Sequence, residues 1–108
     1  MKTILLSFFL LTTQLLFSQK PIVVKIQTSA QCGDCKERIE SKLNQTKGVV
    51  YAELNSETKV VEVKFKESKT TLDAIKGVIV SIGYDADDQK ANVEAQKALP
   101  LCCQPGGH

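Results

Sequence analysis

The chain has 108 residues, a formal net charge of +2, four cysteines, no tryptophan and 6% aromatic residues. The nearly balanced charge gives no indication of binding to nucleic acid or to an anionic membrane surface. The scarcity of aromatic side chains argues against a surface on which bases stack. The four cysteine thiols are therefore the main candidates for a functional site in this sequence.

The N-terminal segment, residues 1–18, has the pattern of a secretory signal peptide. Lys2 gives it a short positive start, an apolar run from Ile4 to Phe17 follows, and cleavage is expected after the small residue Ser18. The run is too short and too interrupted by polar residues for a membrane span. We therefore expect a periplasmic or secreted protein without a membrane span, in a compartment where paired cysteines are by default disulfide-bonded.

The remainder is predicted to form one small domain over residues 19–87 and an extension over residues 88–108. Period-two alternation predicts four strands, the last of them weakly signalled: residues 22–27, 49–54, 59–66 and 84–86. Helical spacing predicts two helices: about residues 34–46, closed by Gly48, and residues 72–82, with a capping box at Thr70–Asp73 and an end at Gly83. The order βαββαβ predicts an α+β, ferredoxin-like fold with a four-stranded antiparallel sheet and two helices on one face.

The C-x-x-C pair of Cys32 and Cys35 is the main candidate site. It follows the first predicted strand and lies at the start of the first predicted helix, where free N–H groups and the helix dipole favour thiolates. Two such thiolates can bind a soft ion, cycle between dithiol and disulfide, or form a structural disulfide. Cu(I) and Hg(II) accept few sulfur ligands, whereas a closed Zn(II) site requires four ligands and is less expected.

The extension is predicted to be a helix over residues 89–99 and a flexible tail after Pro100. The tail carries three potential soft or borderline metal ligands, Cys102, Cys103 and His108. A helix of this length covers roughly 15 Å, and with the residues after Pro100 the extension is long enough to return them to the first cysteine pair. We predict a supplementary metal-capture arm or a redox lid; the alternative is a disordered end whose cysteines oxidise with any nearby thiol.

In this order of elements, with Gly83-Tyr84 after the second helix, the chain resembles the heavy-metal-associated domain. That is the fold of copper chaperones, of N-terminal modules of metal-pumping ATPases and of the periplasmic mercury-binding protein. The resemblance covers about residues 22–87 and places Cys32 and Cys35 on the two metal-binding cysteines, but Ala30 replaces the usual loop methionine. It implies an exported protein that sequesters or transfers Cu(I) or Hg(II), with a membrane metal transporter or another metal-binding domain as partner. The signal peptide favours the mercury-binding protein as the nearer analogue.

Two other classes of function stay open. A thiol–disulfide oxidoreductase would use the same cysteine pair, but the prolines of the mature chain lie near its ends, away from where that family places a cis-proline: Pro21, Pro100 and Pro105. An interaction module would use the solvent face of the sheet and would not need the cysteines. The only histidine is His108, so no general base stands beside a nucleophile and no enzyme is expected. Two positions are predicted for Tyr84. Its ring covers the loop that carries Cys32 and Cys35, called the metal loop below, and excludes water from it, or it lies at the rim of the sheet with its hydroxyl exposed to solvent.

Overall fold

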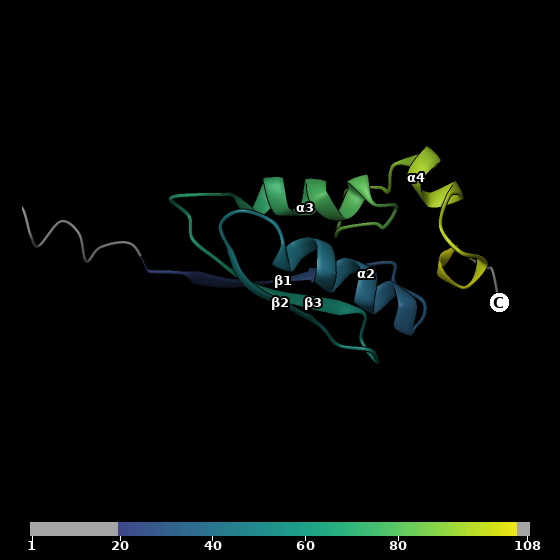
Figure 1. The fold of residues 1–108 in the computed structure, drawn as a ribbon, viewed down its shortest axis with the longest axis horizontal. Coiled ribbons are helices and arrows are strands. Elements are labelled where there is room, and N and C mark those ends of the chain that lie inside the picture. Colours follow the sequence, from purple (N-terminus) through teal and green to yellow (C-terminus); the bar gives the residue numbers. More distant parts are fainter. Residues whose placement is uncertain (1–19, 106–108) are drawn as a thin grey trace, which may run out of the picture.

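The structure is a computed structural model that describes residues 20–105; the predicted signal peptide, Gln19 and His108 lie outside this range. The elements are β1 Ile22–Gln27, α2 Gly33–Asn44, β2 Val49–Leu54, β3 Val60–Phe65, α3 Leu72–Ser81, α4 Val93–Lys97 and the 3₁₀ turn η2 Leu101–Cys103. Helices α2 and α3 cover one face of the sheet, and α4 and η2 lie together at one end of the molecule (Figure 1). None of these helices is long and apolar enough to cross a membrane.

The sheet is antiparallel, with the strand order β1-β3-β2. Strand β1 pairs with β3 along its whole length. The pairing of β2 with β3 shifts register between Val49 and Tyr51, so Val50 lies at an irregularity of the bulge type. The alternation predicts Val50 on the buried face with Ala52 and Leu54, but its side chain is 48% exposed. The prediction that Val50 is buried is wrong, because the bulge adds one residue to β2 and so turns the side chains before Tyr51 to the opposite face of the sheet.

The core lies between the sheet and the two long helices. The buried residues that face one another across this layer are Ile39 and Leu43 from α2, Ile75 and Ile79 from α3, and Val61, Val63 and Phe65 from β3. These are the positions at which the sequence shows helical and alternating apolar spacing. The predicted layering of helices on one sheet face is therefore confirmed.

The N-caps of the two long helices are Cys32 and Thr71. Helix α2 has Cys32 at its N-cap, which places Asp34 inside the first turn rather than at the start. Helix α3 is capped by Thr71, whose hydroxyl accepts a hydrogen bond from the Ala74 N–H at 3.1 Å, instead of by a Thr70–Asp73 capping box. The change at α2 matters for function, because it makes a cysteine the first residue of the helix terminus.

The predicted fourth strand, residues 84–86, is not confirmed. Ala86 makes one isolated bridge to Thr28, and the sheet of the described chain has three strands. Beyond it, Asp87 occupies the edge of β1: its N–H donates to the Gln27 carbonyl, and its carboxylate accepts from the Gln27 N–H, both at 2.8 Å. Asp87 has a φ of +52°, so the chain turns away before a second ladder can extend.

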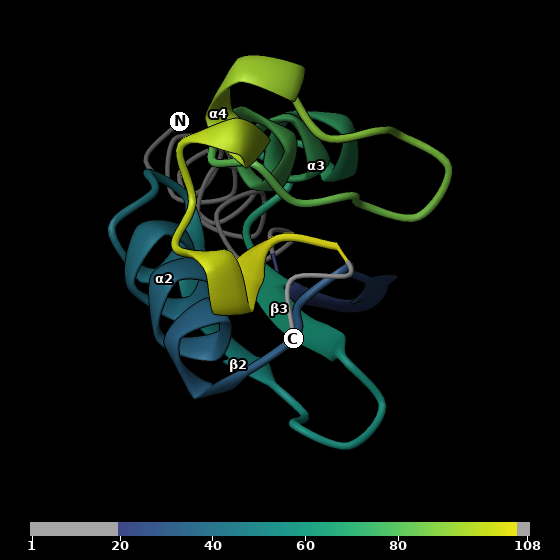
Figure 2. The same cartoon turned by 90° about the vertical axis from the view of Figure 1, so that its right-hand side faces the viewer.

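The helix of the extension is shorter than predicted, because α4 covers only Val93–Lys97. Asn92 caps it by accepting a hydrogen bond from the Ala95 N–H at 2.9 Å. The Asn92 N–H in turn donates to the Val80 carbonyl at 3.1 Å, which ties α4 to the end of α3. After α4 the chain descends and brings η2 against α2, as the turned view shows (Figure 2).

Candidate functional site

Cys32 and Cys35 lie at the N-terminus of α2. The Cys32 carbonyl accepts hydrogen bonds from the N–H groups of Cys35 at 3.0 Å and Lys36 at 3.2 Å, and these bonds form the first turn of the helix. The two cysteine sulfurs are 3.5 Å apart. Cys35 is fully buried and Cys32 is partly exposed. Cys32 is therefore the sulfur of this pair that an incoming ion or thiol meets first.

The loop before α2 is held by side-chain hydroxyls. Thr28 Oγ1 donates to the Lys59 carbonyl at 2.7 Å and accepts from the Ala30 N–H at 3.2 Å. Ser29 Oγ accepts from the Asp85 N–H at 2.9 Å, which joins the loop to the segment after α3. Ala30 itself is buried in the core. Hydrogen bonds to the residue before β3 and to the segment after α3 thus fix this loop.

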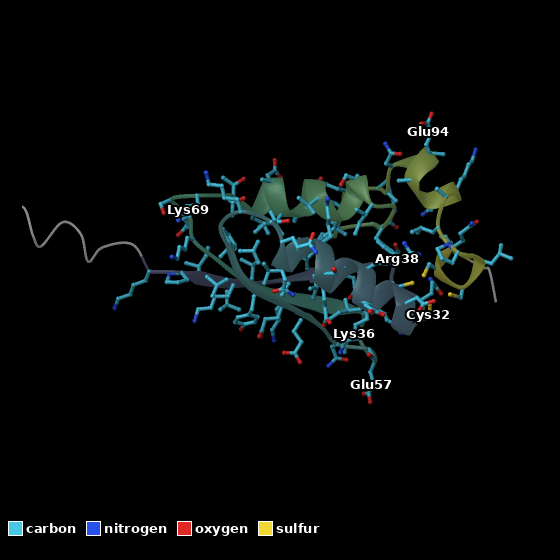
Figure 3. All side chains as sticks on the ribbon, viewed as in Figure 1. Cys32, Lys36, Arg38, Glu57, Lys69 and Glu94 are labelled. Atoms are coloured by element: carbon cyan, nitrogen blue, oxygen red, sulfur yellow. The ribbon has the colours of Figure 1, made fainter. Side chains whose placement is uncertain are left out.

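The structure brings Cys102 and Cys103 to the same place. Cys32 Sγ lies 3.1 Å from Cys102 Sγ and 3.6 Å from Cys103 Sγ, and the last two sulfurs are 3.9 Å apart. All four cysteines are free thiols, and these three sulfurs lie within 4.8 Å of one another. Cys32, at the start of α2, points toward η2, the segment that carries Cys102 and Cys103 (Figure 3). His108, predicted as a further ligand, lies outside the described residues.

The thiols of this cluster differ in acidity. A hydrogen bond with Cys102, followed by one from the Cys35 backbone N–H, lowers the pKa of Cys32 to about 7. The hydrogen bond with Cys32 raises the pKa of Cys102, because a proton is harder to remove from a thiol that lies beside a more acidic one. Burial raises the pKa of Cys103. Of these three thiols, Cys32 is therefore the one that ionises first.

Tyr84 closes the inner side of the cluster. Its N–H donates to the Ile79 carbonyl at 3.2 Å in a Schellman motif that ends α3, and Gly83, with a φ of +105°, supplies the left-handed residue. The Tyr84 side chain is completely buried, so the alternative of a wet hydroxyl at the sheet rim is wrong. Its hydroxyl has no nitrogen or oxygen partner within the described chain. Burial and the neighbouring sulfurs of Cys35 and Cys103 raise its pKa.

The open face of the sheet carries a separate groove of about 450 Å³ without any thiol. Its lining residues are Lys25, Glu53, Asn55, Thr58, Val60 and Glu62. On the same face the Tyr51 hydroxyl donates to the Glu62 carboxylate at 2.8 Å. Charges of both signs, with one carboxylate already bonded to a tyrosine hydroxyl, are typical of a solvated sheet face rather than of a surface shaped for one partner.

Three polar residues that hold the site were not identified from the sequence: Thr28, Ser29 and Gln104. The two hydroxyl residues carry a weak signal, since Ser and Thr at a strand end often bond nearby backbone groups. Gln104 carries none: its side-chain amide donates to the carbonyls of Lys97 at 3.2 Å and Leu99 at 2.8 Å. These partners come together only because the tail folds back.

Comparison with known proteins gives a consistent result. Residues 29–85 match the family described as heavy-metal-associated domain. The copper chaperone CopZ of Staphylococcus aureus (strain bovine RF122) is 43% identical over 54 residues, which are 50% of this chain and 79% of that protein. A copper-exporting P-type ATPase of Staphylococcus saprophyticus is 40% identical over 72 residues, which are 65% of this chain but only 9% of the ATPase.

A solved structure is similar at lower identity. Oxidised MerP from Ralstonia metallidurans CH34 is 19% identical and gives a TM-score of 0.60 over 63% of this chain and 96% of that protein. This likeness shows a shared fold. The family match covers Cys32, Cys35 and Tyr84 but ends before Cys102 and Cys103. The tail cysteines therefore have to be explained from this chain alone.

Proposed function

Since the chain belongs to the heavy-metal-associated domain family, we propose that it binds a soft metal ion through the thiolates of Cys32 and Cys35. The observation that carries this proposal is the separation of 3.5 Å between the two sulfurs at the N-terminus of α2. Free N–H groups at a helix start stabilise thiolates, and soft ions select thiolate ligands. Of the pair, Cys32 has its pKa lowered to about 7 and is therefore ready to bind near neutral pH.

Cu(I) and Hg(II) are the two ions that suit this pair. Both accept low coordination by sulfur, whereas Zn(II) prefers four ligands in a closed site. The copper names of the two relatives from Staphylococcus favour Cu(I) as the first ion to test. Hg(II) follows from the same sulfur chemistry.

The protein sequesters the ion or transfers it, and it catalyses no reaction. Partly exposed Cys32 allows a thiolate of another molecule to approach the ion and replace one sulfur at a time. The acceptor or donor is a membrane metal transporter or another metal-binding domain with its own cysteine pair. The similarity to part of a copper-exporting ATPase supports a partner of this kind.

Export is a separate part of the proposal, supported by the signal-peptide pattern of residues 1–18. Expression in a bacterial host followed by fractionation should place the protein outside the cytoplasm. Intact mass should show an N-terminus at Gln19. Retention of the full chain in the cytoplasm would contradict export without touching metal binding.

The first experiment is a Cu(I) titration of reduced protein under anaerobic conditions, in competition with a Cu(I) chelator and read by native mass spectrometry. We expect one ion per chain in the wild type and loss of tight binding in C32S and in C32S/C35S. Because Cys35 is fully buried, circular dichroism must show that the double variant is folded. The partly exposed position of Cys32 makes C32S the safer variant.

G33S is the matched control, because a Cβ atom at Gly33 meets no atom within 4 Å and both thiols remain. It should bind Cu(I) like the wild type. Weak binding by the wild type, together with turnover of a dithiol substrate, would replace this proposal with the oxidoreductase alternative. None of the similar proteins described above carries a name that indicates such an activity.

A further inference from the structure

The tail of the protein is built against the metal loop. The Gln104 side chain holds the turn by donating to the Leu99 carbonyl at 2.8 Å, and the Cys103 N–H donates to the Pro100 carbonyl at 2.9 Å. Cys103 is 1% exposed and belongs to the hydrophobic core. A cysteine packed at this depth has a fixed position relative to Cys32, unlike the thiol of a loose chain end.

Cys32 lies at the centre of the sulfur cluster. Its Sγ is 3.1 Å from Cys102, 3.5 Å from Cys35 and 3.6 Å from Cys103. The sulfurs of Cys32, Cys102 and Cys103 all lie within 4.8 Å of one another, close enough to hold one ion. Cys32 is thus shared between two sets of ligands, the C-x-x-C pair and a three-sulfur set completed by the tail.

The three-sulfur set has nearly the dimensions of a trigonal thiolate site. A metal–sulfur bond of about 2.3 Å, the value for zinc thiolates, places sulfurs about 4.0 Å apart around a planar three-coordinate ion. In the structure these sulfurs are 3.1, 3.6 and 3.9 Å apart. Small outward movements of the side chains, each less than about 1 Å, therefore make room for an ion of that size.

We propose that Cys102 and Cys103 join Cys32 in a three-thiolate site that retains the soft ion, a role that rests on the proposed metal-binding function. The ion first binds to Cys32 and Cys35. When the tail lies against Cys32 as in the structure, the bond of the ion to Cys35 breaks, and bonds to Cys102 and Cys103 form. Two protons leave the tail thiols for solvent, one proton returns to Cys35, and no electron is transferred.

Retention by the tail opposes release to a partner. A tethered third ligand acts at a high effective concentration, so it strengthens binding and slows dissociation without any change in the first pair. The tail also covers the side of Cys32 on which Cys102 lies, where an acceptor thiolate would otherwise approach. Transfer then requires the tail sulfurs to leave one after the other.

Two measurements test this on the reduced, Cu(I)-loaded protein. X-ray absorption at the copper edge should give three sulfur neighbours in the wild type and two in C102S/C103S. Competition with a chelator should show Cu(I) binding weakened by about tenfold or more in the double variant. C102S alone should shift both readouts in the same direction, and it leaves buried Cys103 and the core intact.

L101S is the matched control, since Leu101 is 73% exposed and precedes the two cysteines. It should keep three sulfurs and the wild-type affinity. Two sulfurs and equal affinity in wild type and C102S/C103S would overturn the three-thiolate site while leaving the Cys32–Cys35 site standing. Two Cu(I) ions per wild-type chain would also overturn it. Failure of the wild type to bind Cu(I), by contrast, would overturn the proposed function itself.

Discussion

The Cys102 sulfur lies 3.1 Å from the Cys32 sulfur, although 70 positions separate the two residues in the chain. Two hydrogen bonds hold the C-terminal extension in the path that brings Cys102 back to Cys32. The Asn92 N–H donates to the Val80 carbonyl, and the Gln104 amide donates to the Leu99 carbonyl. The metal loop and the tail therefore form one structural unit. A change on either side should be measurable on the other.

The first prediction concerns the acidity of Cys32. Its pKa is lowered to about 7, and the hydrogen bond with Cys102 is the largest cause. In the metal-free protein, alkylation of Cys32 by iodoacetamide should rise with pH and reach half of its maximum near pH 7. C102S removes the main stabilisation of the thiolate, so the midpoint should move upward toward the ordinary thiol range. Peptide mass spectrometry after short alkylation pulses at several pH values measures this.

L101S should leave the midpoint of Cys32 unchanged, because that side chain faces solvent and the Cys102 thiol remains. An equal midpoint in wild type and C102S would show that the contact with Cys102 does not control the acidity of Cys32.

The second prediction concerns Asp87, which replaces the fourth strand at the edge of β1. Its carboxylate accepts from the Gln27 N–H at 2.8 Å and lies 3.2 Å from the Lys76 amine. D87A should lower the free energy of unfolding by roughly 1–2 kcal/mol, because the Gln27 N–H and the Lys76 amine lose their partner. D87N should keep part of this stability, since the amide oxygen still accepts and Asn tolerates a positive φ. Urea unfolding followed by circular dichroism gives the values.

The adjacent Asp88 offers the control. It lies 3.9 Å from the same Lys76 amine, but its side chain is 90% exposed. D88A should therefore change stability by less than about 0.5 kcal/mol. Similar losses in D87A and D88A would mean that bulk charge, and not the link to β1, explains the effect.

The layering of this fold can be predicted from the sequence because the buried residues repeat at the periods of helix and strand. Ile39 with Leu43, and Val61 with Val63, are buried as their spacing predicts. The predictions that were wrong concern residues at irregular points of the backbone. Val50 is turned outward at an irregularity in strand pairing, and Gly48, with a φ of +93°, lies in the turn before β2 and not at the end of α2.

The site could be located only in part. The position of Cys32 at a strand–helix junction follows from local sequence, because both elements have clear patterns. The path of the extension does not, because it depends on long-range contacts such as that of Gly83 with α4. Chain length allowed Cys102 to return to the loop, but neither periodicity nor composition indicated how close the sulfurs would lie.

The third prediction concerns Tyr84, whose buried ring closes the cluster from inside. Its hydroxyl makes no hydrogen bond to nitrogen or oxygen within the described residues. Y84F should therefore fold normally, with a change of less than about 1 kcal/mol in the free energy of unfolding. Y84A leaves a cavity beside Cys35 and Cys103 and should cost about 3–5 kcal/mol. A large loss in Y84F would reveal that the contact of the hydroxyl with the sulfurs is a strong one.

The fourth prediction concerns Gly83, the point at which α4 contacts the end of α3. Its φ is +105°, and a Cβ atom there would lie 3.0 Å from the backbone of Ala95. G83A should therefore lower the free energy of unfolding by more than about 1 kcal/mol and push α4 away. Because the tail follows α4, buried Cys103 should become accessible, and its alkylation in the folded protein should accelerate.

Gly77 provides the matched glycine, because it lies inside α3, the helix that ends just before Gly83. A Cβ atom there meets nothing within 4 Å, and no positive φ opposes it. G77A should therefore raise stability by about 0.5–1 kcal/mol, because alanine loses less backbone freedom in a helix interior than glycine. Its Cys103 should stay protected from alkylation. If G83A were destabilised while Cys103 stayed equally protected, the tail would be held by its own contacts with α2 and not through α4.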